Sequence, residues 1–358
     1  MSRNLVVCLD GTANEPEKTP TNVARTFDLA VKDPETQLAY YDPGVGTMGA
    51  RNATSQVGLA LTRIGGLAFG HGIKDNIAEA YQFLMNTYQP GDQIFIFGFS
   101  RGAYTARALA GLLRTVGLLD PGASNLIPYA LKLYTGSPPQ GASEERQERY
   151  WDKVQRWENT FGNPGFRRFG RPVHFLGVWD TVKFVGWFNL VGRFRQARWP
   201  FTRNVDAVAT GRHALAIDER RRPYDAYRFG QAAVEDPERD LQEVWFAGVH
   251  SDVGGGVVDH RLSDIALKWM VDEAKAAGFQ VRAAKYREHV GANPDERLPP
   301  EVLEGPTHPA GPIWALLGGW KPRVVSSGSL VHRSVEVRIK HPTLGYHPRL
   351  EPDVAFVD

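Results

Sequence analysis

One stretch of sequence decides the fold of this chain, Ile94-Phe95-Ile96-Phe97-Gly98-Phe99-Ser100-Arg101-Gly102. Its first four residues form a short, wholly apolar run, which is typical of a buried strand. Residues 103–113 contain few helix breakers and predict a helix. The turn between them needs glycines, because its backbone is strained and the strand and helix approach closely. Such a turn lifts the hydroxyl of Ser100 above the sheet, where a substrate can reach it.

Segments that predict strands and helices alternate along most of the remaining chain. Apolar runs that predict strands lie at residues 5–9, 37–41, 94–97, 173–178 and 244–249. Helices are predicted at residues 22–31, 75–88, 103–113, 144–159 and 263–277, the last with Ser263 as its N-cap. This alternation favours a mostly parallel sheet with helices on both faces. Together with the turn at Ser100, it predicts the α/β-hydrolase fold.

We expect residues 1–358 to form a single α/β-hydrolase domain with two insertions. The first insertion is expected near 120–170, where Pro, Gly and charged residues surround a polar helical stretch. The second is expected near 183–212, where aromatic residues and arginines are mixed. The C-terminal segment 279–358 is Pro-rich and poorly periodic, and we expect it to fold onto the same domain, with a strand at 329–339.

The second insertion predicts a lid-like element. Residues 185–191 are apolar and partly aromatic, and arginines follow them. Aromatic side chains beside cations suit a lipid–water interface, so this stretch is expected to form a lid or an acyl-chain wall near Ser100. The alternative is an ordinary amphipathic helix packed on the sheet.

The composition is that of an ordinary globular protein and excludes several classes. The chain has 358 residues, 42% hydrophobic and 23% charged, and its net charge of +2 gives no field that would attract nucleic acid. Cys8 is the single cysteine, so no disulfide forms within the chain. The first apolar run is too short for a signal peptide, and no run approaches the roughly 18 apolar residues of a membrane span. We expect a soluble cytoplasmic protein, with non-classical export as the alternative.

Three residues stand where a catalytic triad requires them. A serine hydroxyl is a weak nucleophile that needs a general base, and the base needs an orienting acid. In α/β-hydrolases the acid follows the serine along the chain and the histidine comes last, at the carboxyl ends of strands. Asp180 follows the predicted strand 173–178, and His250 follows the predicted strand 244–249. The sequence therefore predicts a triad of Ser100, Asp180 and His250.

The same chemistry requires two backbone N–H donors for the oxyanion of the tetrahedral intermediate. One is expected from Arg101, the residue after the nucleophile. The other is expected from the loop after the first strand, where Gly11 and Thr12 are the candidates. Asp10 is expected at the edge of the site, holding that loop.

Other interpretations exist for the acid and the base. Asp180 could cap a helix or order a turn, and His250 could be a packed histidine at a strand end. Asp252 is the main rival acid, although we expect it to order the glycine turn at 254–256. That glycine run does not continue into a phosphate-binding pattern, so nucleotide binding is not predicted.

Five segments recur together in one known family: 9–12, 98–107, 177–182, 212–221 and 248–256. In this order they resemble the α/β-hydrolase family that includes the catalytic domains of type VI secretion phospholipase effectors. The resemblance covers nearly the whole chain. It implies an esterase or phospholipase A activity that uses a Ser-Asp-His triad, here Ser100, Asp180 and His250, and no metal. Many members have an aromatic residue after the first motif, where this chain has Ala13.

The predicted function is hydrolysis of carboxylic esters, with an ester or phospholipid substrate, transient contact with a membrane surface, and neither cofactor nor metal. Two alternatives are kept. One is a non-catalytic binding module on a hydrolase fold. The other is a metal-dependent phosphatase, suggested by residues 9–12, although the nucleophilic Asp of such enzymes is replaced here by Cys8. Head group, acyl length and oligomeric state are not predicted.

Overall fold

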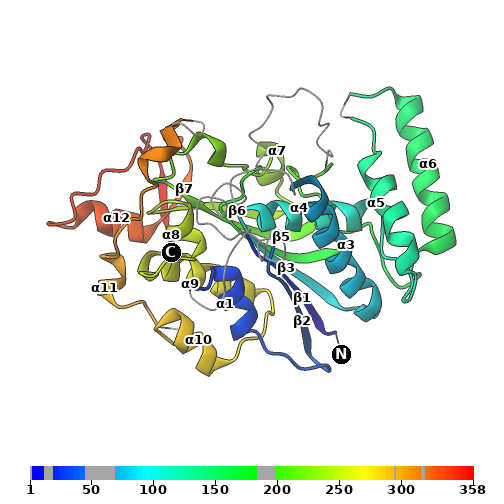
Figure 1. The fold of residues 1–358 in the computed structure, drawn as a ribbon, viewed down its shortest axis with the longest axis horizontal. Helices are drawn as coiled ribbons and strands as arrows, with labels where there is room; N and C mark the ends of the chain where they lie inside the picture. Colours follow the sequence, from blue (N-terminus) through cyan, green and yellow to red (C-terminus); the bar gives the residue numbers. More distant parts are fainter. Residues whose placement is uncertain are drawn as a thin grey trace, which may run out of the picture.

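A computed structural model of the protein describes residues 2–11, 19–44, 69–139, 141–183, 199–293, 296–315 and 319–358. Within these ranges, eight strands form one sheet in the order β2-β1-β3-β4-β5-β6-β7-β8. Every pair of neighbouring strands is parallel. Helices cover both faces of the sheet (Figure 1), so the predicted α/β-hydrolase class is confirmed.

The strands are β1 (Asn4–Leu9), β2 (Gln37–Asp42), β3 (Gln93–Phe99), β4 (Val173–Trp179), β5 (Val208–Ala216), β6 (Asp240–Phe246), β7 (Leu330–His332) and β8 (Ala355–Val357). The larger helices are α1 (Asn22–Leu29), α3 (Phe69–Thr87), α4 (Arg101–Val116), α5 (Ile127–Thr135), α6 (Glu144–Phe161), α9 (Arg261–Ala276), α10 (Ala283–Val290) and α12 (Arg333–Lys340). Shorter helices are α7 (Gln231–Val234), α8 (His250–Gly254) and α11 (Pro300–Leu303).

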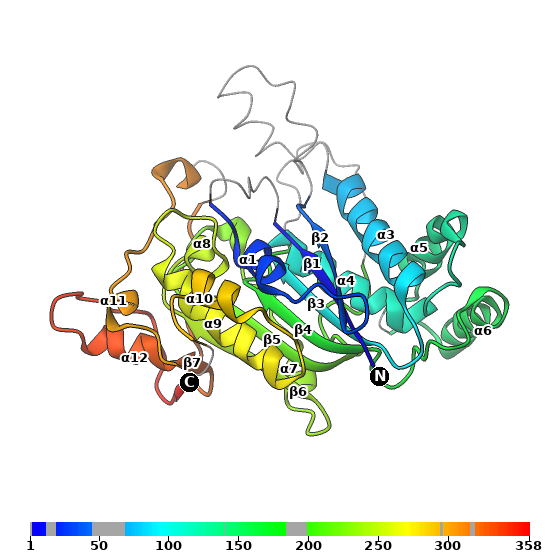
Figure 2. The same cartoon turned by 90° about the horizontal axis from the view of Figure 1, so that it is seen from below.

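Side chains alternate between the two faces of the sheet, as they must along a strand. In β1, Leu5 and Val7 belong to the core that also contains α3, α4, α5 and α6. Val6 and Cys8 belong to the opposite core, with α1, α9 and α10. Figure 2 shows these two sets of helices on opposite sides of the strands. Because both faces are buried, these strands appear in the sequence as continuous apolar runs.

The sequence did not predict β5, because Arg212 and His213 interrupt its apolar pattern. The Arg212 guanidinium forms salt bridges with Asp240 at 2.8 Å and with Glu273 at 2.5 Å. These partners on β6 and α9 satisfy a cation that would otherwise be costly to bury. Tertiary pairing therefore allows a strand where the local pattern does not indicate one.

The C-terminal part of the chain extends the same sheet through β7 and β8. The predicted strand at 329–339 is wrong beyond His332, because α12 begins at Arg333. The side chain of His332 accepts a hydrogen bond from the Ser334 N–H, which caps the helix. Lys340 pairs with Glu336 one turn earlier at 2.5 Å, which further supports α12.

Two predicted boundaries shift around the candidate site. Strand β6 ends at Phe246, and a turn with Gly248 at φ 108° leads into α8, so His250 begins a helix instead of ending a strand. Helix α9 has His260 as its N-cap, not Ser263. The Ser263 hydroxyl lies in the first turn of the helix and donates to the His260 carbonyl at 2.8 Å.

Helices α5 and α6 come from the segment 120–170, and both pack beside α4. Helix α6 lies at the outer edge of the molecule (Figure 1). Of α6, only Tyr150 and Val154 are buried, which agrees with its polar sequence. The lid predicted at 185–191 lies outside the described residues. Among the helices in the described ranges, none is long and apolar enough to cross a membrane.

Candidate active site

Ser100 lies in a sharp turn between the end of β3 and the start of α4. Its backbone has φ 58° and ψ −118°, a left-handed conformation that is strained for any residue except glycine. The turn is held by a hydrogen bond from the Ser100 N–H to the Trp179 carbonyl, at 3.0 Å. The strain is tolerated because the flanking strand and helix fix the turn, which is the geometry of a nucleophile elbow.

Close backbone packing explains why glycine follows the elbow. A Cβ atom on Gly102 would lie 2.1 Å from the Leu9 carbonyl oxygen and 2.5 Å from that of Asp10. Helix α4 therefore starts directly against the end of β1, and no larger residue fits at this position. This contact also brings Asp10, the residue directly after β1, beside the nucleophile turn.

Asp180 follows β4 directly and is fully buried. Its Oδ2 atom accepts a hydrogen bond from Nδ1 of His250 at 2.6 Å. Its Oδ1 atom accepts one from the Ala216 N–H at 3.1 Å, at the end of β5. The structure thus brings together two predicted residues that are 70 positions apart, and the bond to the carboxylate places the Nδ1 proton toward Asp180.

His250, the first residue of α8, stands beside the elbow. The centroid of its ring lies 4.6 Å from that of Phe99, the neighbour of Ser100. The close approach depends on Gly254, since a Cβ atom there would lie 1.9 Å from the Phe99 ring. Within the described residues, no hydrogen bond joins the Ser100 hydroxyl to the imidazole. Such bonds often form only in the substrate complex, and Nε2 is the ring nitrogen left for this role.

The electrostatics favour an ionised acid and a neutral base. Burial by itself would raise the pKa of Asp180, but the nearby Arg323 guanidinium and His250 lower it, and the net pKa lies below its usual range. Burial lowers the pKa of His250 below its ordinary value of 6.5, although Asp180 acts in the opposite direction. A neutral imidazole is the form that can accept a proton from a serine hydroxyl.

Sequence reasoning missed Arg323. Its Nη1 atom donates to Asp180 Oδ1 at 2.6 Å and to the Ala216 carbonyl at 2.8 Å. Its Nη2 atom donates to Asp180 Oδ2 at 3.2 Å and to the Tyr224 carbonyl at 2.5 Å. No local signal marks this arginine, which is one of 42 lysines and arginines and lies in a Pro-rich stretch without periodicity.

Glu219 was also missed as an individual residue, although it lies in one of the five recurring segments. One of its carboxylate oxygens, Oε2, accepts the N–H of His250 at 3.3 Å and pairs with Arg221 at 2.6 Å. The Arg221 pair lowers the pKa of Glu219 in spite of its burial, so the residue carries a negative charge. Glu219 therefore fixes the backbone at the start of α8.

His213 lies in β5 and is excluded as a general base because both ring nitrogens are occupied. Nδ1 donates to Glu243 at 2.8 Å, and Nε2 accepts the N–H of Thr181 at 3.1 Å. Burial lowers the pKa of His213 to about 4. The pair supports the backbone immediately after Asp180, whose own φ is 36°.

Two of the predicted oxyanion donors, Arg101 and Gly11, lie in the part of the chain that the structure describes near the elbow. Arg101 is the first residue of α4, and the N–H groups of a first turn have no acceptor inside their own helix. The Gly11 N–H donates to Asp10 Oδ1 at 2.6 Å, a partner that it would have to exchange for an oxyanion. Asp10 is buried, and its Oδ2 atom accepts hydrogen bonds from the hydroxyls of Tyr41 and Thr21, at 2.8 and 2.6 Å. Thr12 and Ala13 lie outside the described residues.

Asp252 has a different role from the one expected. Its Oδ2 atom accepts the N–H groups of Val249 and His308, at 2.9 and 3.1 Å. Its Oδ1 atom pairs with Nδ1 of His308 at 2.6 Å. The carboxylate therefore fixes the start of α8 and a C-terminal loop, and it makes no hydrogen bond to the glycine turn at 254–256 within the described residues. It is not bonded to His250 Nδ1, which Asp180 occupies.

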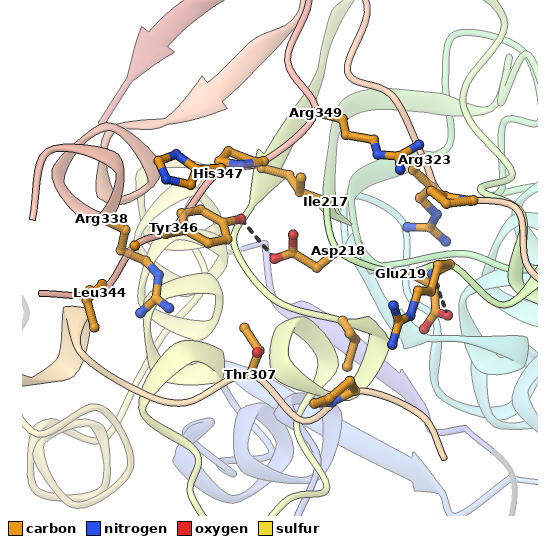
Figure 3. Close-up of a pocket in the computed structure, with 16 residues that line it drawn as sticks. Ile217, Asp218, Glu219, Thr307, Arg323, Arg338, Leu344, Tyr346, His347 and Arg349 are labelled. Atoms are coloured by element: carbon orange, nitrogen blue, oxygen red, sulfur yellow. Dashed lines mark hydrogen bonds between the residues drawn. The ribbon is translucent and has the colours of Figure 1, made fainter. Parts of the chain in front are cut away.

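A cavity of about 460 Å³ adjoins these supporting residues (Figure 3). Glu219 and Arg323 line one side of it, and Tyr346 donates to Asp218 at 2.8 Å on another. Its described lining contains none of the three predicted triad residues. The cavity thus reaches residues that contact Asp180 and His250.

One cluster in the described ranges has the donors for a metal ion, Asp28, Glu288 and His289. Lys285 lies 3.1 Å from an Asp28 oxygen and 2.9 Å from a Glu288 oxygen. This cation already balances the carboxylates, so the cluster is an ion-pair network between α1 and α10.

The sequence has relatives among known proteins. The model of the family described as "T6SS, Phospholipase effector Tle1-like, catalytic domain" matches residues 3–273. An uncharacterized protein of Saccharomyces cerevisiae, YEL023C, is 33% identical over 227 residues, which make up 61% of this chain and 31% of the yeast protein. The chain therefore spans about a third of the length of this curated relative.

Solved structures show more distant likeness. An uncharacterized protein from Pseudomonas aeruginosa has a TM-score of 0.41 and 17% identity, and the match covers 84% of this chain and 48% of that one. The Tle1 effector bound to the VgrG spike of the type 6 secretion system has a TM-score of 0.37 and 18% identity, covering 71% and 51%. The family match contains Ser100, Asp180 and His250 and ends before Arg323.

Proposed function

Because the chain belongs to the family of type VI secretion Tle1-like phospholipase effector catalytic domains, we propose that it is a serine hydrolase that cleaves carboxylic esters of phospholipids. One observation carries the proposal: the Asp180–His250 hydrogen bond of 2.6 Å lies beside a strained serine turn. Acyl transfer by a serine requires a base that is oriented by an acid and that stands near the nucleophile.

In the first half of the proposed cycle, the Ser100 oxygen attacks the ester carbonyl while His250 Nε2 takes its proton. The carbonyl oxygen becomes an oxyanion, which the N–H groups of Arg101 and Gly11 would stabilise. When the intermediate collapses, the C–O bond to the leaving alcohol breaks and His250 returns the proton to that alcohol. The acyl group remains on Ser100.

In the second half, water attacks the acyl-enzyme and gives its proton to His250. Collapse of the second intermediate releases the carboxylic acid, and the proton returns to Ser100. Asp180 stabilises the imidazolium that forms in each half and keeps the ring in the correct tautomer. No metal takes part in this sequence, which uses only the protons and electron pairs of ester, water and triad.

The phosphatase alternative lacks a usable nucleophile. Cys8 stands at the required position but is fully buried in β1, and burial raises the pKa of its thiol. The binding-module alternative is opposed by the place of the Asp180–His250 pair beside the strained turn at Ser100, with Nε2 of His250 making no hydrogen bond within the described structure.

Replacement of Ser100 by Ala tests the proposal. We expect the variant to fold normally and to lose release of fatty acid from phosphatidylcholine vesicles and turnover of a short p-nitrophenyl ester. A fluorophosphonate probe should label the wild type and the matched control Ser326→Ala, whose serine is exposed, but not Ser100→Ala. Full activity of Ser100→Ala would rule out the proposed function.

A further inference from the structure

Arg323 is a buried cation that contacts the predicted acid of the triad with both of its terminal nitrogens. Nη1 lies 2.6 Å from one oxygen of Asp180, and Nη2 lies 3.2 Å from the other. Both side chains are almost completely excluded from solvent. A two-point contact of this kind fixes the plane of the carboxylate as well as its charge.

The charge count at the site depends on Arg323. Asp180 and Arg323 form a neutral pair, so a neutral His250 completes a cluster without net charge. Without the guanidinium, the buried Asp180–His250 pair would carry one negative charge. Such a pair takes up a proton more readily, because an isolated buried charge is costly.

The other ionisable groups around this cluster do not replace Arg323. Glu219 and Arg221 balance each other at 2.6 Å, although both influence His250. The Tyr224 ring packs edge-on against the His250 ring, with the two centroids 4.9 Å apart. His213 is held neutral by its burial and pairs with Glu243. Among the described residues, Arg323 is the cation in direct contact with Asp180.

Arg323 is held in place from two directions. The Lys321 N–H donates to the Arg220 carbonyl at 2.7 Å, and Val325 exchanges hydrogen bonds with Arg349 and Glu351, at 3.0 and 2.9 Å. These bonds tie the loop to the segment after β5 and to the segment before β8. Figure 3 shows the Arg323 side chain in the wall of the cavity.

We propose that Arg323, supplied by the C-terminal segment beyond the family-matched region, is a positioning residue that orients Asp180 and sets the pH range in which His250 accepts a proton. The inference rests on the proposed function, because it assigns Arg323 a role in the same triad. It makes the C-terminal segment part of the catalytic unit.

The test measures kcat/KM against pH for p-nitrophenyl ester hydrolysis by the full chain. Arg323→Met removes the charge at similar length, and we expect its acid limb to move to higher pH by about one unit or more. Arg323→Lys keeps the charge and should restore the limb toward the wild-type position. The matched control is Arg349→Met, which lines the same cavity but makes no ion pair in the described structure; its profile should stay unchanged.

If Arg323→Met does not fold, Arg323→Gln carries the same prediction, because it also removes the charge but keeps hydrogen-bonding groups. An acid limb at the wild-type pH in a folded, uncharged variant would overturn the inference. A double variant gives a second measurement: in an Asp180→Asn background, loss of Arg323 should no longer move the limb, whereas a merely structural role would leave its effect intact.

The outcome is separable from that of the proposed function. If Ser100→Ala loses activity but the acid limb of the pH profile does not move in the Arg323 variants, only the positioning role is rejected. Retained activity in Ser100→Ala would reject the proposed function itself.

Discussion

A buried histidine is bonded to a carboxylate at two places in the molecule. One pair lies just after the carboxyl ends of β4 and β6, and the other lies inside the sheet, on β5 and β6. At the strand ends, His250 Nδ1 lies 2.6 Å from Asp180; in the interior, His213 Nδ1 lies 2.8 Å from Glu243. The difference is at Nε2. In His213 this nitrogen accepts a backbone N–H, whereas in His250 it makes no hydrogen bond within the described structure and the ring stands beside the elbow.

The comparison shows that a buried acid–histidine pair is not by itself catalytic. What distinguishes the two pairs is whether the second ring nitrogen is left for a reacting proton. His213 is used to hold the backbone after Asp180, so the interior pair supports the pair at the strand ends. Substitutions at each histidine separate these two roles.

The largest effect is expected for His250→Gln. Removing the base should lower kcat by about six orders of magnitude, because the oxyanion donors and substrate binding alone remain. Stability to denaturant should change little by comparison. Esterase assays on the purified variant check this, and substantial remaining turnover would place the general base elsewhere.

The interior pair should respond in the opposite way. His213→Leu leaves the Thr181 N–H without its acceptor and removes one of the donors to buried Glu243, and we expect a loss of about 3 kcal/mol in unfolding free energy. The folded fraction should still react with a fluorophosphonate at Ser100. Denaturant titration and probe labelling test this; abolished labelling at unchanged stability would mean that His213 belongs to the reacting group.

The pH dependence sharpens the comparison. The pKa of His213 is about 4 in the folded state and 6.5 in its unperturbed state, so the unfolded chain binds more protons between these values. Stability should therefore be fully present above pH 6.5 and decline as the pH falls toward 4. His213→Leu should flatten this part of the profile in denaturant titrations. An equally steep decline in the variant would assign the acid sensitivity to other groups.

The smallest effect is expected at a third pair, Asp252–His308, whose histidine side chain is 35% exposed. His308→Ala should cost about 1 kcal/mol, because buried Asp252 loses one partner but keeps the N–H groups of Val249 and residue 308. Asp252 still caps the start of α8, so ester turnover should stay within about twofold. A large loss of activity would show that this pair takes part in positioning His250.

The elements predicted best were those whose signals are local. The glycines around Ser100 mark a steric requirement of a few neighbouring residues, and the apolar runs of β1, β3 and β4 mark strands buried on both faces. By contrast, β5 and α12 were missed, because Arg212 finds its partners on β6 and α9, and His332 caps a helix inside an expected strand. These outcomes depend on contacts that the local pattern does not contain.

By itself, the sequence determined the α/β-hydrolase class, the elbow at Ser100 and the order in which Asp180 and His250 follow it. The reason is that strand burial and tight turns restrict which residues can stand at each position. Only the tertiary structure decided that Arg323, 143 residues after Asp180, lies against that carboxylate and that both nitrogens of His213 are occupied. Charge pairing inside a protein is decided by which side chains share a buried space, and chain spacing does not reveal this.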